Sequence, residues 1–142
     1  LELSDAPVVA THSSLRHFTP GWERNVSDEM LIALAENGGV IQLCFGSDFV
    51  ANRKDNPDIQ VSVKNVVDHI DRVRDLVGID HVGFGSDFDG EVPLPEDIND
   101  VSKFPNLIEE LLMRGYTESE IDKILNGNIL RVWKEVRALA DA

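Results

Sequence analysis

Polar side chains that could bind a metal or transfer a proton follow two short apolar stretches of the sequence. The apolar residues 81–84 are followed by Asp87 in a loop rich in glycine and acidic residues, and the apolar residues 6–11 are followed by His12. This pattern is typical of a buried strand that ends in a tight polar loop. In a parallel α/β protein such loops lie at one edge of the sheet, where the chemistry takes place. We therefore predict that His12 and Asp87 lie at the same edge.

Imidazole and carboxylate groups are ordinary zinc ligands, so His12 and Asp87 could bind one metal ion together. A catalytic zinc ion normally takes three protein ligands, and two ligands do not make a site. The other histidines are poor candidates for the third ligand. His69 lies within a predicted helix, His81 starts a strand at the opposite edge, and the place of His17 is ambiguous.

Two simpler interpretations of the residues around Asp87, a calcium loop and an ordinary turn, compete with a metal site. A calcium loop of the EF-hand type counted from Asp87 would require Gly at position 92 and Glu at position 98, whereas the sequence has Val92 and Ile98. The calcium loop is therefore excluded. An ordinary turn agrees with the local composition, because Asp and Gly are common turn residues. The other motifs of the sequence are needed to distinguish an ordinary turn from a functional site.

The elements that would position these side chains alternate between strand and helix. The predicted strands are residues 6–11, 40–45 and 81–84. Ser27 can cap a helix of about ten residues that ends at Gly38. Residues 63–77 form the clearest amphipathic helix, and residues 46–57 are predicted to be a long loop. Because each connection is long enough for a right-handed βαβ unit, the predicted fold is α/β with three parallel strands.

The carboxyl-terminal part of the chain is predicted to be helical. Pro105 suits the first turn of a helix that Gly115 ends. Thr117 and Glu120 form a capping box for the next helix, and Gly127 interrupts that helix before a terminal one begins.

The composition limits the number of domains and the kinds of partner. A chain of 142 residues with 42% hydrophobic residues can build one core, so we expect one domain or part of one. The formal net charge of −13 disfavours binding to nucleic acid or to an anionic membrane surface. The single Cys44 excludes an intrachain disulfide, and its place in an apolar run predicts a small buried side chain rather than a nucleophile.

No apolar run is long enough to span a membrane, and residues 1–5 lack the basic region of a signal peptide. These features favour a cytoplasmic location, while secretion or a membrane anchor stays open. The sequence starts without Met, and residues 1–5 look like the end of a helix from a longer chain.

Five segments carry motifs that recur together. They are APVVATHSS at 6–14, RNV at 24–26, GFGSDFDG at 83–90, DVSKFP at 100–105 and GNILRV at 127–132. In this order they strongly resemble the carboxyl-terminal part of the renal (membrane) dipeptidase family, which consists of zinc-dependent dipeptidases with an amidohydrolase-type (β/α)8 TIM barrel. The resemblance covers essentially all 142 residues. It implies that the chain holds the last three strand–helix units of the barrel and its C-terminal helices.

The resemblance also implies roles for three residues. His12 matches a histidine that binds one zinc ion of a two-metal centre. Arg24 matches the arginine that holds the terminal carboxylate of the substrate, a task suited to its planar bidentate group. Asp87 matches the acidic residue that handles the proton of the attacking water and of the leaving amine. In the family mechanism the two metals polarise the scissile carbonyl and supply a hydroxide.

The amino-terminal part of the family fold supplies an early His-x-Asp pair, a bridging Glu and another metal-binding His, and no segment of this sequence matches them. We therefore expect residues 1–142 to be a partial, C-terminal segment of a dipeptidase barrel domain that is inactive alone. Its expected partners are a dipeptide substrate, the missing N-terminal part of the barrel and further copies of the chain in a homo-oligomer, because open sheet edges invite pairing.

The leading functional prediction is metal-dependent hydrolysis of dipeptides by the complete enzyme. Another amidohydrolase-type reaction, such as the opening of a cyclic amide, is an alternative that a panel of substrates would test. A non-catalytic, truncated interaction module without a metal is the other alternative, and zinc analysis of the purified chain would distinguish it.

Overall fold

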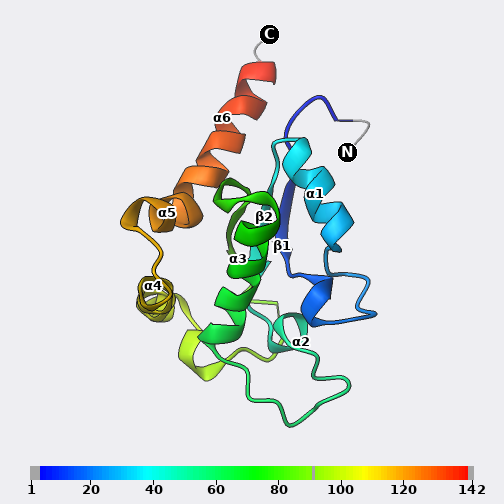
Figure 1. Ribbon diagram of the computed structural model, residues 1–142, viewed down its shortest axis with the longest axis vertical. Helices are drawn as coiled ribbons and strands as arrows, with labels where there is room; N and C mark the ends of the chain where they lie inside the picture. The colour runs from blue at the N-terminus through cyan, green and yellow to red at the C-terminus, as the bar shows by residue number, and fades with distance from the viewer. Residues whose placement is uncertain (1–3, 91, 141–142) are drawn as a thin grey trace.

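The computed structural model describes residues 4–90 and 92–140, which form a sheet with helices packed on it (Figure 1). The strands are β1 (Val9–Ser13), β2 (Val40–Cys44) and β3 (Val82–Ser86). The α-helices are α1 (Asp28–Glu36), α2 (Ser47–Val50), α3 (Val63–Val77), α4 (Phe104–Met113), α5 (Glu118–Asp122) and α6 (Asn128–Ala140). Short 3₁₀ turns cover Arg16–Phe18, Ile79–His81, Glu96–Ile98 and Val101–Lys103, and a π-helical segment, Lys123–Gly127, joins α5 to α6.

The three strands pair in the order β1-β2-β3, and both pairs are parallel. Val9 lies opposite Val40, and Ile41 lies opposite Val82. Because the strands run in the same direction, their carboxyl ends meet at one edge of the sheet. This topology confirms the predicted α/β fold of three parallel strands with flanking helices.

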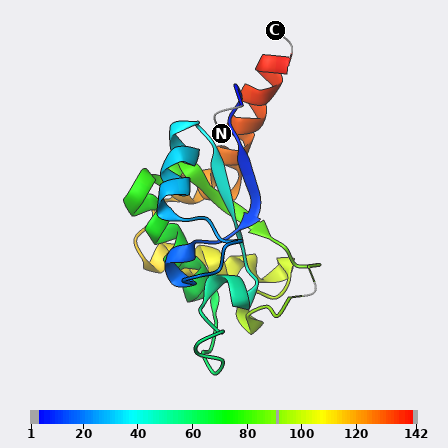
Figure 2. The same ribbon diagram turned by 90° about the vertical axis from the view of Figure 1, so that its right-hand side faces the viewer.

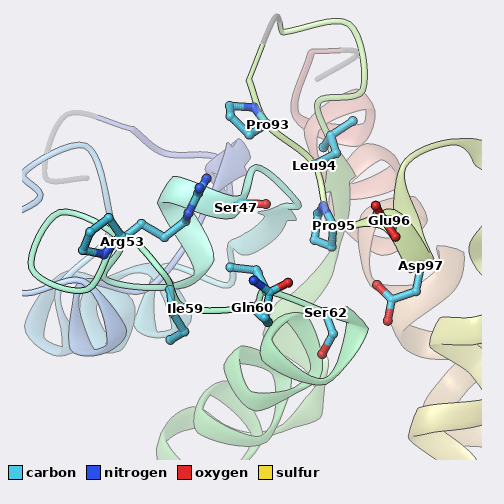
Figure 3. A pocket seen from close by; sticks show the side chains of 12 residues that line it. Ser47, Arg53, Ile59, Gln60, Ser62, Pro93, Leu94, Pro95, Glu96 and Asp97 are labelled. Atoms are coloured by element: carbon cyan, nitrogen blue, oxygen red, sulfur yellow. The ribbon is translucent and has the colours of Figure 1, made fainter.

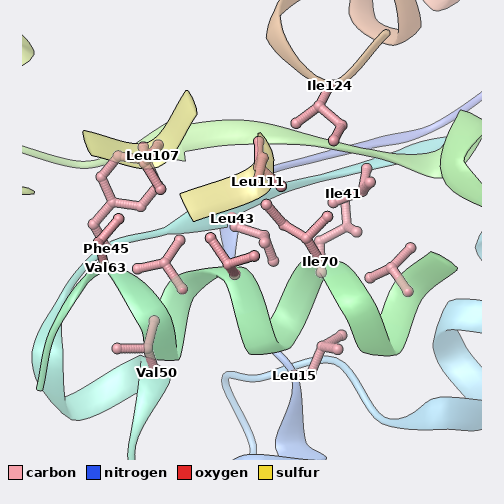
Figure 4. Close-up of a cluster of buried hydrophobic side chains, with 14 of the residues drawn as sticks. Leu15, Ile41, Leu43, Phe45, Val50, Val63, Ile70, Leu107, Leu111 and Ile124 are labelled. Carbon is pink, nitrogen blue, oxygen red and sulfur yellow. The ribbon is translucent and has the colours of Figure 1, made fainter. Parts of the chain in front are cut away.

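Helices α1 and α3 lie on the same side of the sheet (Figure 2). Ile41 and Leu43 of β2 and the following Phe45 are fully buried, and they point toward α3 and α4 (Figure 4). Intervening residues of β2 point to the other face, as the pleat of a strand requires. Burying each large aliphatic or aromatic side chain contributes roughly 1.5–3 kcal/mol. This core holds the strands rigidly in register.

The predicted amphipathic helix at residues 63–77 is confirmed as α3. Its apolar side chains Val66, Val67, Ile70 and Val73 are fully buried. Ser62 and Asn65 form a capping box at its start. The other predicted helix starts are confirmed as well: the Ser27 side chain accepts from Met30 N in α1, Thr117 and Glu120 form the capping box of α5, and Pro105 lies in the first turn of α4.

The predicted bounds of the first strand are wrong. The strand was expected at residues 6–11, whereas β1 begins at Val9 and continues to Ser13. The reason is the side chain of Asn37, which accepts a hydrogen bond from Val8 N (2.8 Å) and donates one to Ala6 O (3.3 Å). The Asn37 side chain therefore takes up Val8 N and Ala6 O, while Val8 O accepts from Val40 N (3.1 Å), and His12 lies inside β1 rather than beyond it.

Two further expectations need correction. The predicted loop at residues 46–57 contains α2, because the carbonyl of Gly46 accepts from the backbone of Val50 and the Phe49 and Val50 side chains are buried. Gly127 does not interrupt the helices: the chain runs through Lys123–Gly127 as a π-helical segment directly into α6. Within residues 4–90 and 92–140, no helix has both the length and the apolar character needed to cross a bilayer.

Candidate functional site

Arg24 and Asp87 come together at the edge where the parallel strands end. Asp87 directly follows β3, which continues two residues further than predicted, and Arg24 lies in the loop between β1 and α1. Arg24 Nη2 is 3.8 Å from Asp87 Oδ2, and the two side chains are 35% and 20% exposed. The pair therefore combines a cation and a carboxylate that a small ligand can reach.

The backbone at Asp87 adopts an unusual conformation for a residue with a side chain. Ser86 and Asp87 have φ angles of 22° and 66°, a region that costs non-glycine residues roughly 1–2 kcal/mol each. The turn is closed by Gly90 N, which donates to Asp87 O (3.2 Å). This turn aims the carboxyl group back over the end of the sheet instead of continuing the strand.

Two neighbours besides Arg24 fix the Asp87 carboxylate. The thiol of Cys44, at the end of β2, donates to Asp87 Oδ2 with an Sγ–O distance of 3.6 Å. On the other side, a Cβ atom at Gly90 would lie only 2.7 Å from Asp87 Oδ1, so the carboxylate occupies space that only glycine leaves free. The carboxylate is thus packed between a thiol, a guanidinium group and bare backbone.

Arg24 is held at both of its ends. Its backbone carbonyl accepts a hydrogen bond from Ser13 Oγ at the end of β1 (3.1 Å). Its guanidinium carbon lies 4.2 Å from the centroid of the Phe49 ring in α2. Arg24 therefore links β1, α2 and the turn after β3.

His12 lies near the end of β1 and takes no part in the contacts of this pair among the described residues. It is exposed in β1, and its Nδ1 lies 2.8 Å from Thr11 Oγ1. Across residues 4–90 and 92–140, no hydrogen bond joins His12 to Arg24 or Asp87, and no group of three or more His, Cys, Asp or Glu side chains could hold a metal ion. The donors of the described residues thus do not fit a complete metal centre.

His69 and His81, the poor candidates for a third metal ligand, both contact backbone atoms. Leu15 N donates to His69 Nδ1 (3.0 Å), which leaves Nε2 to donate to Val50 O (3.1 Å). Complete burial lowers the pKa of His69 to about 4, so the ring is neutral. His81 contacts Gly39 O through Nδ1 (2.8 Å), and His17 lies in a 3₁₀ turn with its ring edge-on to Phe18.

Cys44 is fully buried, as predicted, and burial raises the pKa of its thiol. Its contact with Asp87 was missed, although the alternation of β2 gives a signal. Gln42 and Cys44 lie on the face opposite the core, where Gly83 and Gly85 of β3 provide space. An added Cβ at Gly83 would lie 2.2 Å from Gln42 Oε1, so Gln42 covers the bare backbone of β3.

Phe49 is the second residue that the sequence did not reveal. It lies in the segment predicted as a loop, and its ring is 9% exposed. The available signal was the adjacent apolar pair Phe49 and Val50 within a polar stretch, directly after Gly46.

A pocket with a volume of about 470 Å³ lies beside α2 (Figure 3). Its walls include Arg53, Gln60 and Asp97, and none of His12, Arg24 and Asp87 lines it. The backbone of Ser47 donates to Pro93 O (2.7 Å) and joins the two loops that form its rim. The pocket is therefore separate from the Arg24–Asp87 pair.

The family model for membrane dipeptidase (peptidase family M19) matches residues 1–142. The chain belongs to this family. The match confirms the resemblance carried by the five sequence motifs. One solved structure of this family, dipeptidase AC, is described as a metallopeptidase; it has a TM-score of 0.84 and 35% identity over 94% of this chain and 38% of its own.

Individual relatives agree with this assignment. Dipeptidase ataJ from Aspergillus terreus is 45% identical over 140 residues, which is 99% of this chain and 33% of that protein. A metallopeptidase from Rhodobacter sphaeroides, crystallised with a phosphinate mimic of the dipeptide L-Ala-D-Ala, has a TM-score of 0.84 and 35% identity over 94% of this chain and 37% of its own. The probable dipeptidase PvdM from Pseudomonas aeruginosa has a TM-score of 0.87 and 28% identity over 96% of this chain and 46% of its own.

The chain spans about a third of the length of the curated relatives it matches. About two thirds of each of these relatives therefore lies outside the matched segment.

Proposed function

We propose that residues 1–142 are the carboxyl-terminal part of a dipeptidase barrel domain, and that the complete enzyme hydrolyses dipeptides with bound zinc. In this proposal Arg24 binds the terminal carboxylate of the substrate and Asp87 transfers protons. His12 contributes one zinc ligand, and the remaining ligands come from outside this chain, because the donors described here do not complete a metal centre.

The observation that carries the proposal is the 3.8 Å approach of Arg24 Nη2 to Asp87 Oδ2. In a dipeptide only one Cα atom separates the terminal carboxylate carbon from the scissile nitrogen, and standard bond lengths put these two atoms about 2.5 Å apart. A substrate whose carboxylate is bound by Arg24 therefore carries its leaving nitrogen within reach of Asp87. Every peptide with a free carboxyl end has its last peptide nitrogen at this distance, so the pair accounts for binding of the carboxyl end and not for the length of the substrate.

The chemistry of the two side chains suits these tasks. The guanidinium group of Arg24 can donate two parallel hydrogen bonds to a carboxylate, which fixes its orientation as well as its position. A carboxylate next to the bound end can accept a proton from water and return it to the leaving amine. The phosphinate mimic of L-Ala-D-Ala bound to the Rhodobacter sphaeroides relative supports dipeptides as the substrate class.

The free sheet edges support the proposed partners. Within the described residues β1 and β3 each pair only with β2, so each has one edge without a strand. We propose that the amino-terminal part of the barrel pairs with these edges in the complete enzyme, and that the isolated chain self-associates through them.

The test compares free and C-terminally amidated dipeptides as substrates of the complete, metal-loaded enzyme. Arg24→Lys should lower kcat/KM for free dipeptides roughly tenfold or more, because an ammonium group cannot make the same two charged hydrogen bonds. Amidated dipeptides should be poor substrates for the wild type and should lose little further in the variant.

Arg74→Lys is the matched control, because Arg74 also lies over an aromatic ring, 4.8 Å from the centroid of Tyr116, but on α3 away from the site. It should leave the ratio between free and amidated substrates unchanged. Equal wild-type rates on free and amidated dipeptides would contradict the role of Arg24.

A further inference from the structure

The Phe49 ring lies between Arg24 and Trp22 at the carboxyl edge of the sheet. Arg24 Cζ is 4.2 Å from its centroid, well inside the roughly 6 Å limit of a cation–π contact. The Trp22 ring meets it at a centroid distance of 5.7 Å and an interplanar angle of 80°. The ring thus touches a cation and an aromatic group at the same time.

The ring is fixed by the backbone around it. A Cβ atom at Gly46 would lie 2.8 Å from Phe49 Cδ2, so the ring packs directly on bare backbone. The carbonyl of Phe49 accepts a hydrogen bond from Asn25 Nδ2 (2.8 Å). Asn25 directly follows Arg24 in the chain and is almost fully buried. The loop that carries Arg24 is therefore joined to α2 by this hydrogen bond to the Phe49 backbone and by the contact of Arg24 with the Phe49 ring.

A flexible arginine needs such support to act as a selective ligand. The free side chain samples many rotamers, and ordering it on substrate binding costs conformational entropy and so lowers the affinity. Phe49 restrains the guanidinium group through one face and leaves its N–H groups free to donate in the plane. Among residues 4–90 and 92–140, Arg24 makes no closer contact to a carboxylate than the 3.8 Å to Asp87, so with respect to these residues its donors are available to a ligand.

We propose that Phe49 is a positioning residue that orders Arg24 for the terminal carboxylate of a dipeptide and so contributes to the selection of substrates with a free carboxyl end. The proposal rests on the carboxylate-binding role of Arg24 proposed above. It assigns the ring no contact with the scissile bond. The loss of the ring should therefore raise KM for free dipeptides and leave kcat nearly unchanged.

The experiment is a double-mutant cycle in the complete, metal-loaded enzyme, with Phe49→Leu, Arg24→Ala and the double variant assayed on free and C-terminally amidated dipeptides. Phe49→Leu should lower kcat/KM for free dipeptides by roughly two- to thirtyfold, the range that cation–π attraction supports. It should not change kcat/KM for amidated dipeptides, and it should have no further effect in the Arg24→Ala background. Phe49→Tyr, which keeps a ring, should retain the wild-type preference.

Two controls separate positioning from packing. Phe49→Met removes the ring while keeping the volume of the side chain and provides a second ring-free variant should Phe49→Leu fold poorly. Phe104→Leu removes a ring that packs on Phe45, Phe84 and Phe88 and has no contact with Arg24, so it should lower stability without changing the substrate preference.

The outcomes are distinguishable. If Phe49→Leu and Phe49→Met lower activity equally on both substrates, have no effect, or act unchanged in the Arg24→Ala background, Phe49 is only a packing residue and the inference is wrong. If Arg24→Ala itself leaves the preference for free dipeptides intact, the proposed function of Arg24 fails, and this inference fails with it.

Discussion

Gly90 gives a sharp test of the position of the Asp87 carboxylate. A Cβ atom added at Gly90 would lie 2.7 Å from Oδ1, 2.8 Å from Cγ and 2.9 Å from Oδ2 of Asp87. Gly90 lies outside the left-handed φ region, so alanine can adopt its backbone conformation without strain. Gly90→Ala should therefore displace the Asp87 carboxylate and leave the backbone conformation at residue 90 unchanged.

The size of the displacement follows from these distances. Ordinary van der Waals contact begins at 3.4 Å, so Oδ1 has to retreat from residue 90 by about 0.7 Å, which disturbs the contacts of the carboxylate with Cys44 and Arg24. A misplacement of about 1 Å in a reacting group can cost about a hundredfold in rate. We expect kcat to fall roughly ten- to hundredfold with a small change in KM, because the substrate carboxylate binds elsewhere. The free energy of unfolding should change by less than about 1 kcal/mol.

The assay is steady-state hydrolysis of a free dipeptide by the complete enzyme, with a thermal unfolding curve for each variant. Gly127→Ala is the matched control: its added Cβ would meet its nearest neighbour, Asp122 O, at an ordinary 3.5 Å. This variant should keep wild-type kcat. A folded Gly90→Ala enzyme with wild-type kcat would refute the reasoning, since it would mean that the carboxylate position seen here does not matter for the reaction.

Three further predictions concern Asp87, His69 and the chain as a whole. Asp87→Asn in the complete enzyme should keep the fold and lower kcat by roughly a hundredfold or more, the usual scale for proton-transfer groups, and near-wild-type turnover would remove Asp87 from the mechanism. The folded chain should lose about 3 kcal/mol of stability as the pH falls from 6.5 to 4, because the unfolded His69 takes up a proton there while the folded one, with a pKa of about 4, does not. Chemical denaturation across this range should show the loss, and His69→Gln should flatten it; an unchanged slope in that variant would assign the loss to other groups. Residues 1–142 alone, supplied with zinc, should hydrolyse no dipeptide, and a monomer that binds two zinc ions tightly and turns over substrate would contradict the proposed role of this chain as part of a larger enzyme.

Local sequence signals predicted most of the fold. The 3.6-residue spacing in residues 63–77 gave the position of α3, and side chains that cap their own helix, such as Ser27 and Thr117, marked helix starts. These signals work because the interacting groups lie three or four residues apart. The bounds of β1 were missed because Asn37, distant in sequence, holds the backbone of Ala6 and Val8.

The site depends on contacts between residues that are distant in the sequence. Arg24, Phe49 and Asp87 come from separate loops, and nothing local in the sequence relates them. The family resemblance could point to Arg24 and Asp87 one by one, but it could not reveal that Phe49 supports one of them or that Cys44 contacts the other. Such pairings become visible only when the parallel strands bring their carboxyl ends together.

At three glycines near this edge of the sheet, the lack of a side chain leaves room for a neighbouring group. Gly46 accommodates the Phe49 ring that restrains Arg24, and Gly90 accommodates the Asp87 carboxylate. At Gly85 a Cβ atom would lie 2.2 Å from Thr11 O, so glycine there lets β3 approach the strand that carries His12. Each of these positions gives up side-chain burial and adds backbone entropy to the unfolded chain, which costs roughly 0.5–1 kcal/mol relative to alanine. At Gly46 and Gly90 the chain accepts this cost next to one pair of charged side chains, so it positions that pair at the expense of stability, which is the balance expected if the pair acts in catalysis as proposed above.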